Sequence, residues 1–214
     1  MQSKIILLTT AILIFVPAIF FFVCDFGQVS IGKRTLLSLF QSVTTRTAGF
    51  NTADLSSMTE AGQAIMILLM LIGGSPSSTA GGMKTTTVAA LLLNAFATFR
   101  SREDAGAFGR RFDSQVIKNA ATIAMLYFVL FFFGGITISV YEGLSLQLCL
   151  YEAASAVGTV GLTLGITPGL HILSRLILIV LMYLGRVGGL TLIYAVLSRR
   201  NMNAKMPLEK ITVG

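Results

Sequence analysis

The chain carries one pattern twice, and this internal duplication constrains the fold more than any other feature. Thr47-Ala48-Gly49-Phe50 recurs as Thr159-Val160-Gly161-Leu162, 112 positions further on (161 minus 49). At the same offset, the apolar run 66–73 aligns with the apolar run 178–185. Two matches at one offset indicate two copies of one structural unit. We predict that each unit has an apolar helix, a short re-entrant segment that ends in Thr-x-Gly, and a second apolar helix.

The composition predicts an all-α membrane protein made of two helix–pore loop–helix repeats. Of 214 residues, 54% are hydrophobic and only 12% are charged, with a mean hydropathy of +0.81, whereas soluble domains carry about 25% charged residues. The net charge of +7 comes from basic residues at the ends of apolar runs, a pattern that orients membrane helices. We therefore expect a lipid bilayer, and no nucleic acid, as the partner of these charges. With one histidine and no Cys/His cluster, we expect no zinc-type site.

Four apolar runs are predicted to span the membrane: 5–23, an interrupted run 63–99, 116–140 and 172–197. The first run could also be a signal peptide, but its length and the lack of an Ala-x-Ala site favour a true span. The Arg-rich segment between the repeats is predicted to be cytoplasmic. The repeats are then residues 1–100 and 115–214, joined by a linker at 101–114, in the plasma (inner) membrane with both termini cytoplasmic. Cys24 and Cys149 fall near the outer face, where apolar packing is favoured over a disulfide.

Each Thr-x-Gly turn follows a predicted pore helix, at 36–45 and at 146–157. Backbone carbonyls at such a turn can replace the hydration shell of potassium, and the partly negative helix C-terminus favours a cation there. The alternative is a tight turn between two membrane helices, which the second copy makes less attractive. The predicted filter, with potassium as the bound ion and substrate and with no covalent cofactor, comprises Thr45, Arg46, Thr47, Ala48, Gly49, Val157, Gly158, Thr159, Val160 and Gly161.

The stretch 73–87, GGSPSSTAGGMKTTT, is polar although apolar residues flank it on both sides. Irregular backbone at membrane depth is tolerated only when protein buries it or it lines a water-filled cavity. We predict an intramembrane gating loop below the filter. A phosphate-binding P-loop is disfavoured, because Met83 stands where that motif requires glycine. The predicted gate residues are Gly73, Gly74, Ser75, Pro76, Ser77, Ser78, Thr79, Ala80, Gly81, Gly82, Lys84 and Arg186.

Arg186 interrupts the last apolar run. An arginine at the bilayer centre costs about 2.5–3.5 kcal/mol on insertion scales, so it should face protein or water and have a partner. The repeat offset places it level with Gly74, and the carbonyls and hydroxyls of the loop are natural partners. A role in the gate and a role in fastening two helices together are both open.

The chain resembles the C-terminal half of the membrane subunit of Trk/Ktr/HKT-type potassium transporters, and the Ktr type most closely. The motifs that carry the resemblance are TTRTAGFN at 44–51, GGSP…GGMKTTT at 73–87 and YLGRVGG at 183–189. It implies four helix–pore–helix repeats around one pore, filter glycines at Gly49 and Gly161, a gating loop at 73–82 and a gate role for Arg186. It also implies a homodimer of complete subunits and a cytoplasmic nucleotide-binding regulatory ring.

The chain departs from the family in having two repeats where the family has four. It therefore predicts either a missing half of the pore or a second copy of the chain as a partner. The expected function is potassium uptake as the ion-translocating subunit; the alternative is a truncated, non-conducting membrane scaffold. An enzyme is not expected, because no Ser/His/Asp, Cys/His or paired-carboxylate constellation lies at membrane depth.

Overall fold

The fold is mostly helical, and the computed structural model describes residues 1–102 and 104–188. In chain order these form α1 (Gln2–Cys24), α2 (Ile31–Thr44), α3 (Glu60–Leu71), α4 (Thr85–Phe99), β1 (Gly106–Ala107), β2 (Arg110–Arg111), α5 (Ser114–Glu142), α6 (Leu146–Val157) and α7 (Ile172–Val187). Short 3₁₀ turns lie at Leu55–Ser57 and Thr167–Gly169. The predicted fourth span, 172–197, extends past Val187 into residues outside the described part.

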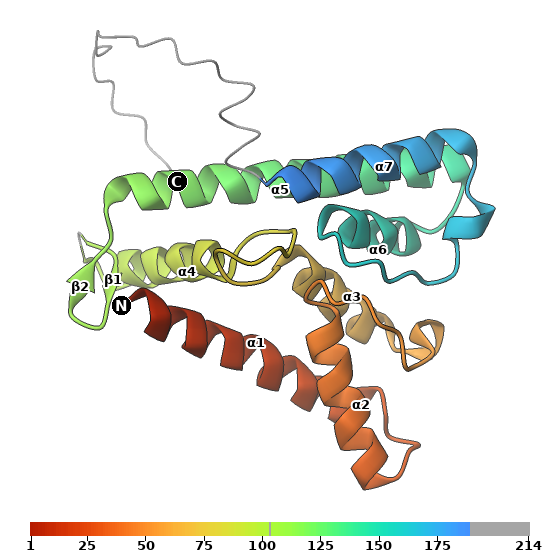
Figure 1. The fold of residues 1–214 in the computed structure, drawn as a ribbon, viewed down its shortest axis with the longest axis horizontal. Helices are drawn as coiled ribbons and strands as arrows, with labels where there is room; N and C mark the ends of the chain where they lie inside the picture. The colour runs from red at the N-terminus through yellow and green to blue at the C-terminus, as the bar shows by residue number, and fades with distance from the viewer. Residues whose placement is uncertain (103, 189–214) are drawn as a thin grey trace, which may run out of the picture.

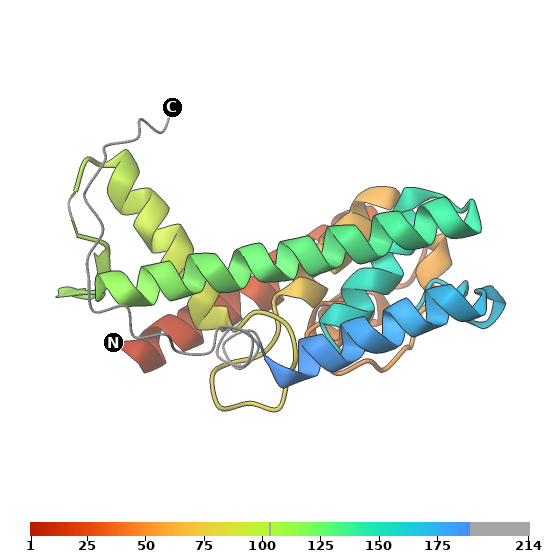
Figure 2. The ribbon, with the colours of Figure 1, turned by 90° about the horizontal axis from the view of Figure 1, so that it is seen from above.

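Helix α5 runs along the whole long axis of the molecule, and α7 lies antiparallel beside it (Figures 1 and 2). Among the described residues, α1 and α5 are the two helices that are long and apolar enough to cross a membrane. At about 1.5 Å per residue, helices of 23 and 29 residues exceed a hydrocarbon core of about 30 Å. The start of α1 and the β1–β2 hairpin share one end of the molecule, where Lys4 Nζ lies 5.6 Å from the ring centre of Phe108.

Helices α3 and α4 follow one another along the long axis, with the polar loop between them (Figure 1). They have 12 and 15 residues, so each extends only about 18–23 Å and neither spans a bilayer alone. The predicted break in the second apolar run is therefore confirmed. The non-helical stretch is shorter than the predicted 73–87, because α4 already begins at Thr85. Thr85, Thr86 and Thr87 form the first turn of α4, where the N–H groups of Thr87 and Val88 donate to the carbonyl of Lys84 and the side chain of Lys84 does not cap the helix.

Helices are present at both positions where the sequence predicted pore helices. Helix α6 has the predicted bounds, whereas α2 begins at Ile31 rather than Leu36. The polar residues before Leu36 are helical because Arg34 ties this turn to the end of α1. Its Nε donates to the carbonyl of Phe22 at 2.5 Å, and its guanidinium lies 4.2 Å from the centre of the Phe22 ring.

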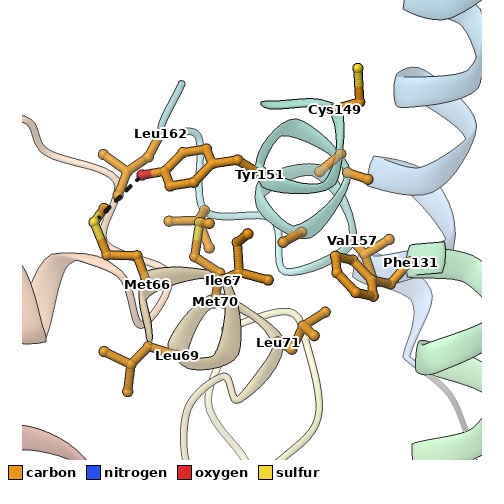
Figure 3. Packing of buried hydrophobic residues seen from close by; sticks show 14 of the residues in the cluster. Met66, Ile67, Leu69, Met70, Leu71, Phe131, Cys149, Tyr151, Val157 and Leu162 are labelled. Atoms are coloured by element: carbon orange, nitrogen blue, oxygen red, sulfur yellow. Dashed lines mark hydrogen bonds between the residues drawn. The ribbon is translucent and has the colours of Figure 1, made fainter. Parts of the chain in front are cut away.

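The core is assembled around α6 (Figure 3). Tyr151 is fully buried, and its hydroxyl contacts Met66 Sδ of α3 at 3.9 Å. Met70 of α3, Val157 of α6 and Phe131 of α5 belong to the same buried cluster. Helix α6 is therefore held from several sides, so the residues that follow its C-terminus have a fixed starting point.

The predicted linker at 101–114 contains a short β-hairpin and is not plain solvated chain. Gly106–Ala107 pairs antiparallel with Arg110–Arg111, and the turn between them contains Phe108 and Gly109, both with positive φ. The two described cysteines are free thiols: Cys149 is buried in the core and Cys24 is exposed. The pairing of Cys24 with Cys149, the disfavoured alternative, is therefore not formed.

Candidate functional site

The first Thr-x-Gly segment, residues 45–49, is anchored to the C-terminal end of α2. The backbone N–H groups of Ala48 and Gly49 both donate to the carbonyl of Thr44 at 3.1 Å, and Thr44 Oγ1 donates to the carbonyl of Phe50 at 2.6 Å. Thr47 has φ +65° and Gly49 has φ +76°. The left-handed region costs a non-glycine residue about 1–2 kcal/mol, so these anchors hold Thr47 in an unfavourable conformation.

The second Thr-x-Gly segment, residues 157–161, repeats this conformation at the end of α6. Thr159 has φ +52° and Gly161 has φ +91°. Ser155 supplies both anchors: its carbonyl accepts from the N–H of Val160 at 2.9 Å, and its Oγ accepts from the N–H of Gly161 at 3.1 Å. Both segments thus carry positive φ at the threonine and at the glycine, with negative φ between them.

This alternation has a chemical consequence. In an extended strand successive carbonyls point to opposite sides, and changing the sign of φ at every second residue turns them toward one side. The ends of α2 and α6 lead directly into these segments, so their partly negative C-termini lie nearby. Carbonyls turned to one side beside two helix C-termini would favour a cation, which is the arrangement that the filter prediction requires.

The two segments touch one another at Gly49. A Cβ atom added at Gly49 would overlap the carbonyl oxygen of Val160, whereas one added at Gly161 would meet no atom within 4 Å. The second segment also packs against α3, since a Cβ atom added at Gly158 would overlap the carbonyl of Met70. One at Gly185 of α7 would overlap the carbonyl of Val157. Helices α3 and α7 therefore pack directly onto its backbone.

The polar loop between α3 and α4 is closed at a neck of backbone hydrogen bonds. Gly73 N donates to the carbonyl of Met83 at 2.8 Å, and Met83 N donates to that of Leu71 at 2.9 Å. Thr85 N adds a bond of 3.2 Å to the carbonyl of Gly74. The residues between, 75–82, are thus presented as one compact loop.

Two cationic side chains bind three successive carbonyls of this loop. Lys84 Nζ donates to the carbonyls of Ala80 at 2.5 Å and Ser78 at 3.3 Å. Arg186 Nη1, from the end of α7, donates to the carbonyl of Thr79 at 2.6 Å. The predicted contact of Arg186 with the loop is therefore present, although the side chain stays exposed in the described chain.

The loop reaches both Thr-x-Gly segments. Gly81 packs so closely on Thr159 that an added Cβ atom would overlap the threonine hydroxyl, and Arg46 Nη2 lies 3.5 Å from the carbonyl of Gly73. A cavity of about 540 Å³ is lined by the loop, α4, α5 and the end of α7. A second cavity, of about 570 Å³, follows the second segment along α7. Arg186 lines both cavities and therefore stands between them.

The structure brings the sequence-predicted residues together, but two of them lie at helix ends. Thr45 and Val157 are fully buried at the helix ends rather than in the open segments. Glu152 was not anticipated: its buried carboxylate binds the chain that follows the second segment. The signal in the sequence was that Glu152 is the single charged residue between 146 and 157.

Comparison with known proteins gives consistent matches. The profile of the TrkH family, described as cation transport protein, matches residues 1–205. The potassium/sodium uptake protein NtpJ of Enterococcus hirae is 36% identical over 226 residues, covering 100% of this chain and 50% of NtpJ. The Ktr system potassium uptake protein B of Bacillus subtilis is 31% identical over 220 residues, covering 100% of this chain and 49% of that protein.

A solved structure shows the same fold. The crystal structure of the potassium transporter TrkH from Vibrio parahaemolyticus superposes with a TM-score of 0.73 at 20% identity, over 89% of this chain and 43% of that one. The chain thus spans about half the length of the curated relatives it matches.

Proposed function

Because the chain belongs to the TrkH family of cation transport proteins, we propose that it takes up potassium across the plasma (inner) membrane. In this proposal it is the ion-translocating part of a Trk/Ktr-type transporter. The observation that carries the proposal is the pair of Thr-x-Gly segments that meet at Gly49 and Val160, each with positive φ at its threonine and glycine. Relatives named as potassium or potassium/sodium uptake proteins support the choice of ion.

Potassium enters the filter by exchanging water for protein oxygens. The carbonyls of the open parts of the two segments, residues 46–49 and 158–161, supply oxygen ligands on one side of the ion path. Because the backbone is held in place by the Thr44 and Ser155 anchors, the oxygens need little reorganisation when the ion arrives. The helix C-termini offset part of the cost of dehydrating the ion.

The loop at 73–82 acts as the gate in this proposal. It lies against Thr159 of the second filter segment, and so obstructs an ion leaving the filter. Lys84 and Arg186 hold its carbonyls and add positive charge to the same place, which disfavours a cation. Opening requires the loop to leave these two donors.

The arrangement in the cell follows from the same proposal. Residues 1–100 and 115–214 form two helix–pore–helix repeats joined at 101–114, with both termini cytoplasmic. The pore is completed by two further repeats, from a missing half or a second copy. Complete subunits form a homodimer on a cytoplasmic nucleotide-binding ring. We call the chain together with the two further repeats the assembled pore.

Rubidium uptake tests the proposal. The chain is expressed in a bacterial host that lacks its own potassium uptake systems, alone and together with two further repeats. We expect the assembled pore to restore growth at low potassium and to take up rubidium. An assembled, membrane-inserted pore that passes neither ion would overturn the proposal and favour the non-conducting scaffold.

A further inference from the structure

Glu152 is a carboxylate in an apolar core. It is the only charged residue of α6, its neighbours Tyr151 and Ala153 are fully buried, and Glu152 itself is 4% exposed. Burying a carboxylate is costly unless hydrogen bonds and an opposite charge compensate it. Its position therefore calls for identified partners.

The hydrogen-bond partners all come from the chain just beyond the second filter segment. Thr163 Oγ1 donates a short hydrogen bond to Oε1, and Leu164 N donates to the same oxygen at 3.2 Å. Thr167 Oγ1 donates to Oε2 at 2.8 Å. Three donated bonds suit an ionised carboxylate, which only accepts. They also fix residues 163–167, where the chain leaves the filter.

No described side chain forms an ion pair with Glu152; Arg186, whose guanidinium donates to the carbonyl of Thr79, lines the same cavity. The two ion pairs in the described part of the chain join Arg111 to Asp104 and His171 to Glu142, and neither includes Glu152. Glu152 does line the 570 Å³ cavity together with Val160 and Gly161 of the filter. The negative charge thus faces the place where we put the transported cation.

The feature belongs to one repeat only. At the repeat offset of 112, the position equivalent to Glu152 (152 minus 112) is Phe40, an apolar residue. In the first repeat a hydroxyl, Thr44 Oγ1, holds the chain beyond the filter. The second repeat therefore adds a charge that the first repeat does not need for its fold.

We infer that Glu152 is a determinant of cation affinity, with its charge drawing a dehydrated monovalent cation to the second filter segment. Its hydrogen bonds meanwhile fix the exit of that segment. The inference rests on the proposed function, because it assigns a role within the same filter.

Rubidium uptake by the assembled pore tests the inference, with KM and maximal rate measured separately. Glu152→Gln removes the charge and keeps the shape, and should raise KM by about tenfold, the order of a Coulomb attraction inside a protein. The maximal rate should change much less. Barium, a divalent ion close in size to potassium, serves as a competitor. Because Coulomb energy scales with ionic charge, its inhibition constant should rise by about the square of the change for rubidium.

A second pair of variants keeps the test independent of how Glu152→Gln folds. Thr163 is exposed and donates to the carboxylate. Thr163→Lys and Thr163→Val both remove that bond, but only lysine neutralises Glu152. The lysine variant should raise KM like Glu152→Gln, and the valine variant should raise it far less.

Three results would overturn the inference: an unchanged KM in Glu152→Gln, equal changes for rubidium and barium, or equal KM values in the two Thr163 variants. If the parent takes up rubidium normally, any of these three results overturns only the inference about Glu152 and leaves the proposed function intact. Absent uptake by the parent overturns both.

Discussion

Replacing Gly49 or Gly161 by serine should weaken the discrimination of potassium from sodium, and by different amounts. Both glycines have positive φ, at +76° and +91°. A side chain there makes the backbone conformation that aims the carbonyls unfavourable. The two positions differ in their surroundings, because Gly49 lies against the carbonyl of Val160 whereas Gly161 faces open space.

The structure sets the expected size of each effect. A left-handed conformation costs a non-glycine residue about 1–2 kcal/mol, and about 1.4 kcal/mol corresponds to a tenfold change in an equilibrium. Gly161→Ser should therefore reduce discrimination by about tenfold. Gly49→Ser should reduce it further, since its Cβ atom also overlaps Val160 O and must push the two filter segments apart.

The assay is rubidium uptake by the assembled pore in the presence of increasing sodium. Gly109→Ser is the matched control, because Gly109 has φ +73° and open space around it but lies in the turn of the β1–β2 hairpin. It carries the same conformational strain and should leave ion discrimination unchanged. Unchanged discrimination in both filter variants, or an equal loss in Gly109→Ser, would refute the reasoning.

Three further outcomes are expected. Deleting residues 75–80 should raise rubidium flux, because the obstruction beside the filter is shortened; a variant that inserts normally and conducts at the parent rate would show that the loop is not a gate. Arg186→Ala should also raise rubidium flux, since it removes a charged donor to Thr79 O worth about 1.5–3 kcal/mol. Arg186→Lys should stay closer to the parent. Equal fluxes in the parent, Arg186→Ala and Arg186→Lys would show that this contact does not restrain the loop. The isolated chain should not persist as a monomer in lipid, because exposed polar groups cost several kcal/mol each in hydrocarbon; a monodisperse monomer in native mass measurements would contradict this.

Much of the fold was predictable from where apolar character starts and stops. Helix α6 was placed to the residue because Ser145 and Gly158 bound its apolar run. The loop between α3 and α4 was predicted because polar residues interrupt an apolar run, and an arginine at the same depth needed a partner. The contact between Arg186 and Thr79 O meets that need.

The remainder depended on tertiary contacts that a sequence does not display. The start of α2 is helical because Arg34 binds the end of α1, a contact between residues 12 positions apart. Positive φ at Thr47 and Thr159 runs against the preference of threonine, so no local signal predicted it. Glu152 gave an ambiguous signal, since one acid in an apolar run does not reveal which donors surround it.

The neck of the loop, where Leu71, Gly73 and Met83 share backbone hydrogen bonds, makes loop length a separately adjustable property. The bonds join the ends of α3 and α4 directly, so residues added or removed between 75 and 82 do not displace either helix. Under the proposed gate role, insertion or deletion between 75 and 80 would change the resting conductance, while the packing of Gly81 on Thr159 and the two helices would keep their geometry.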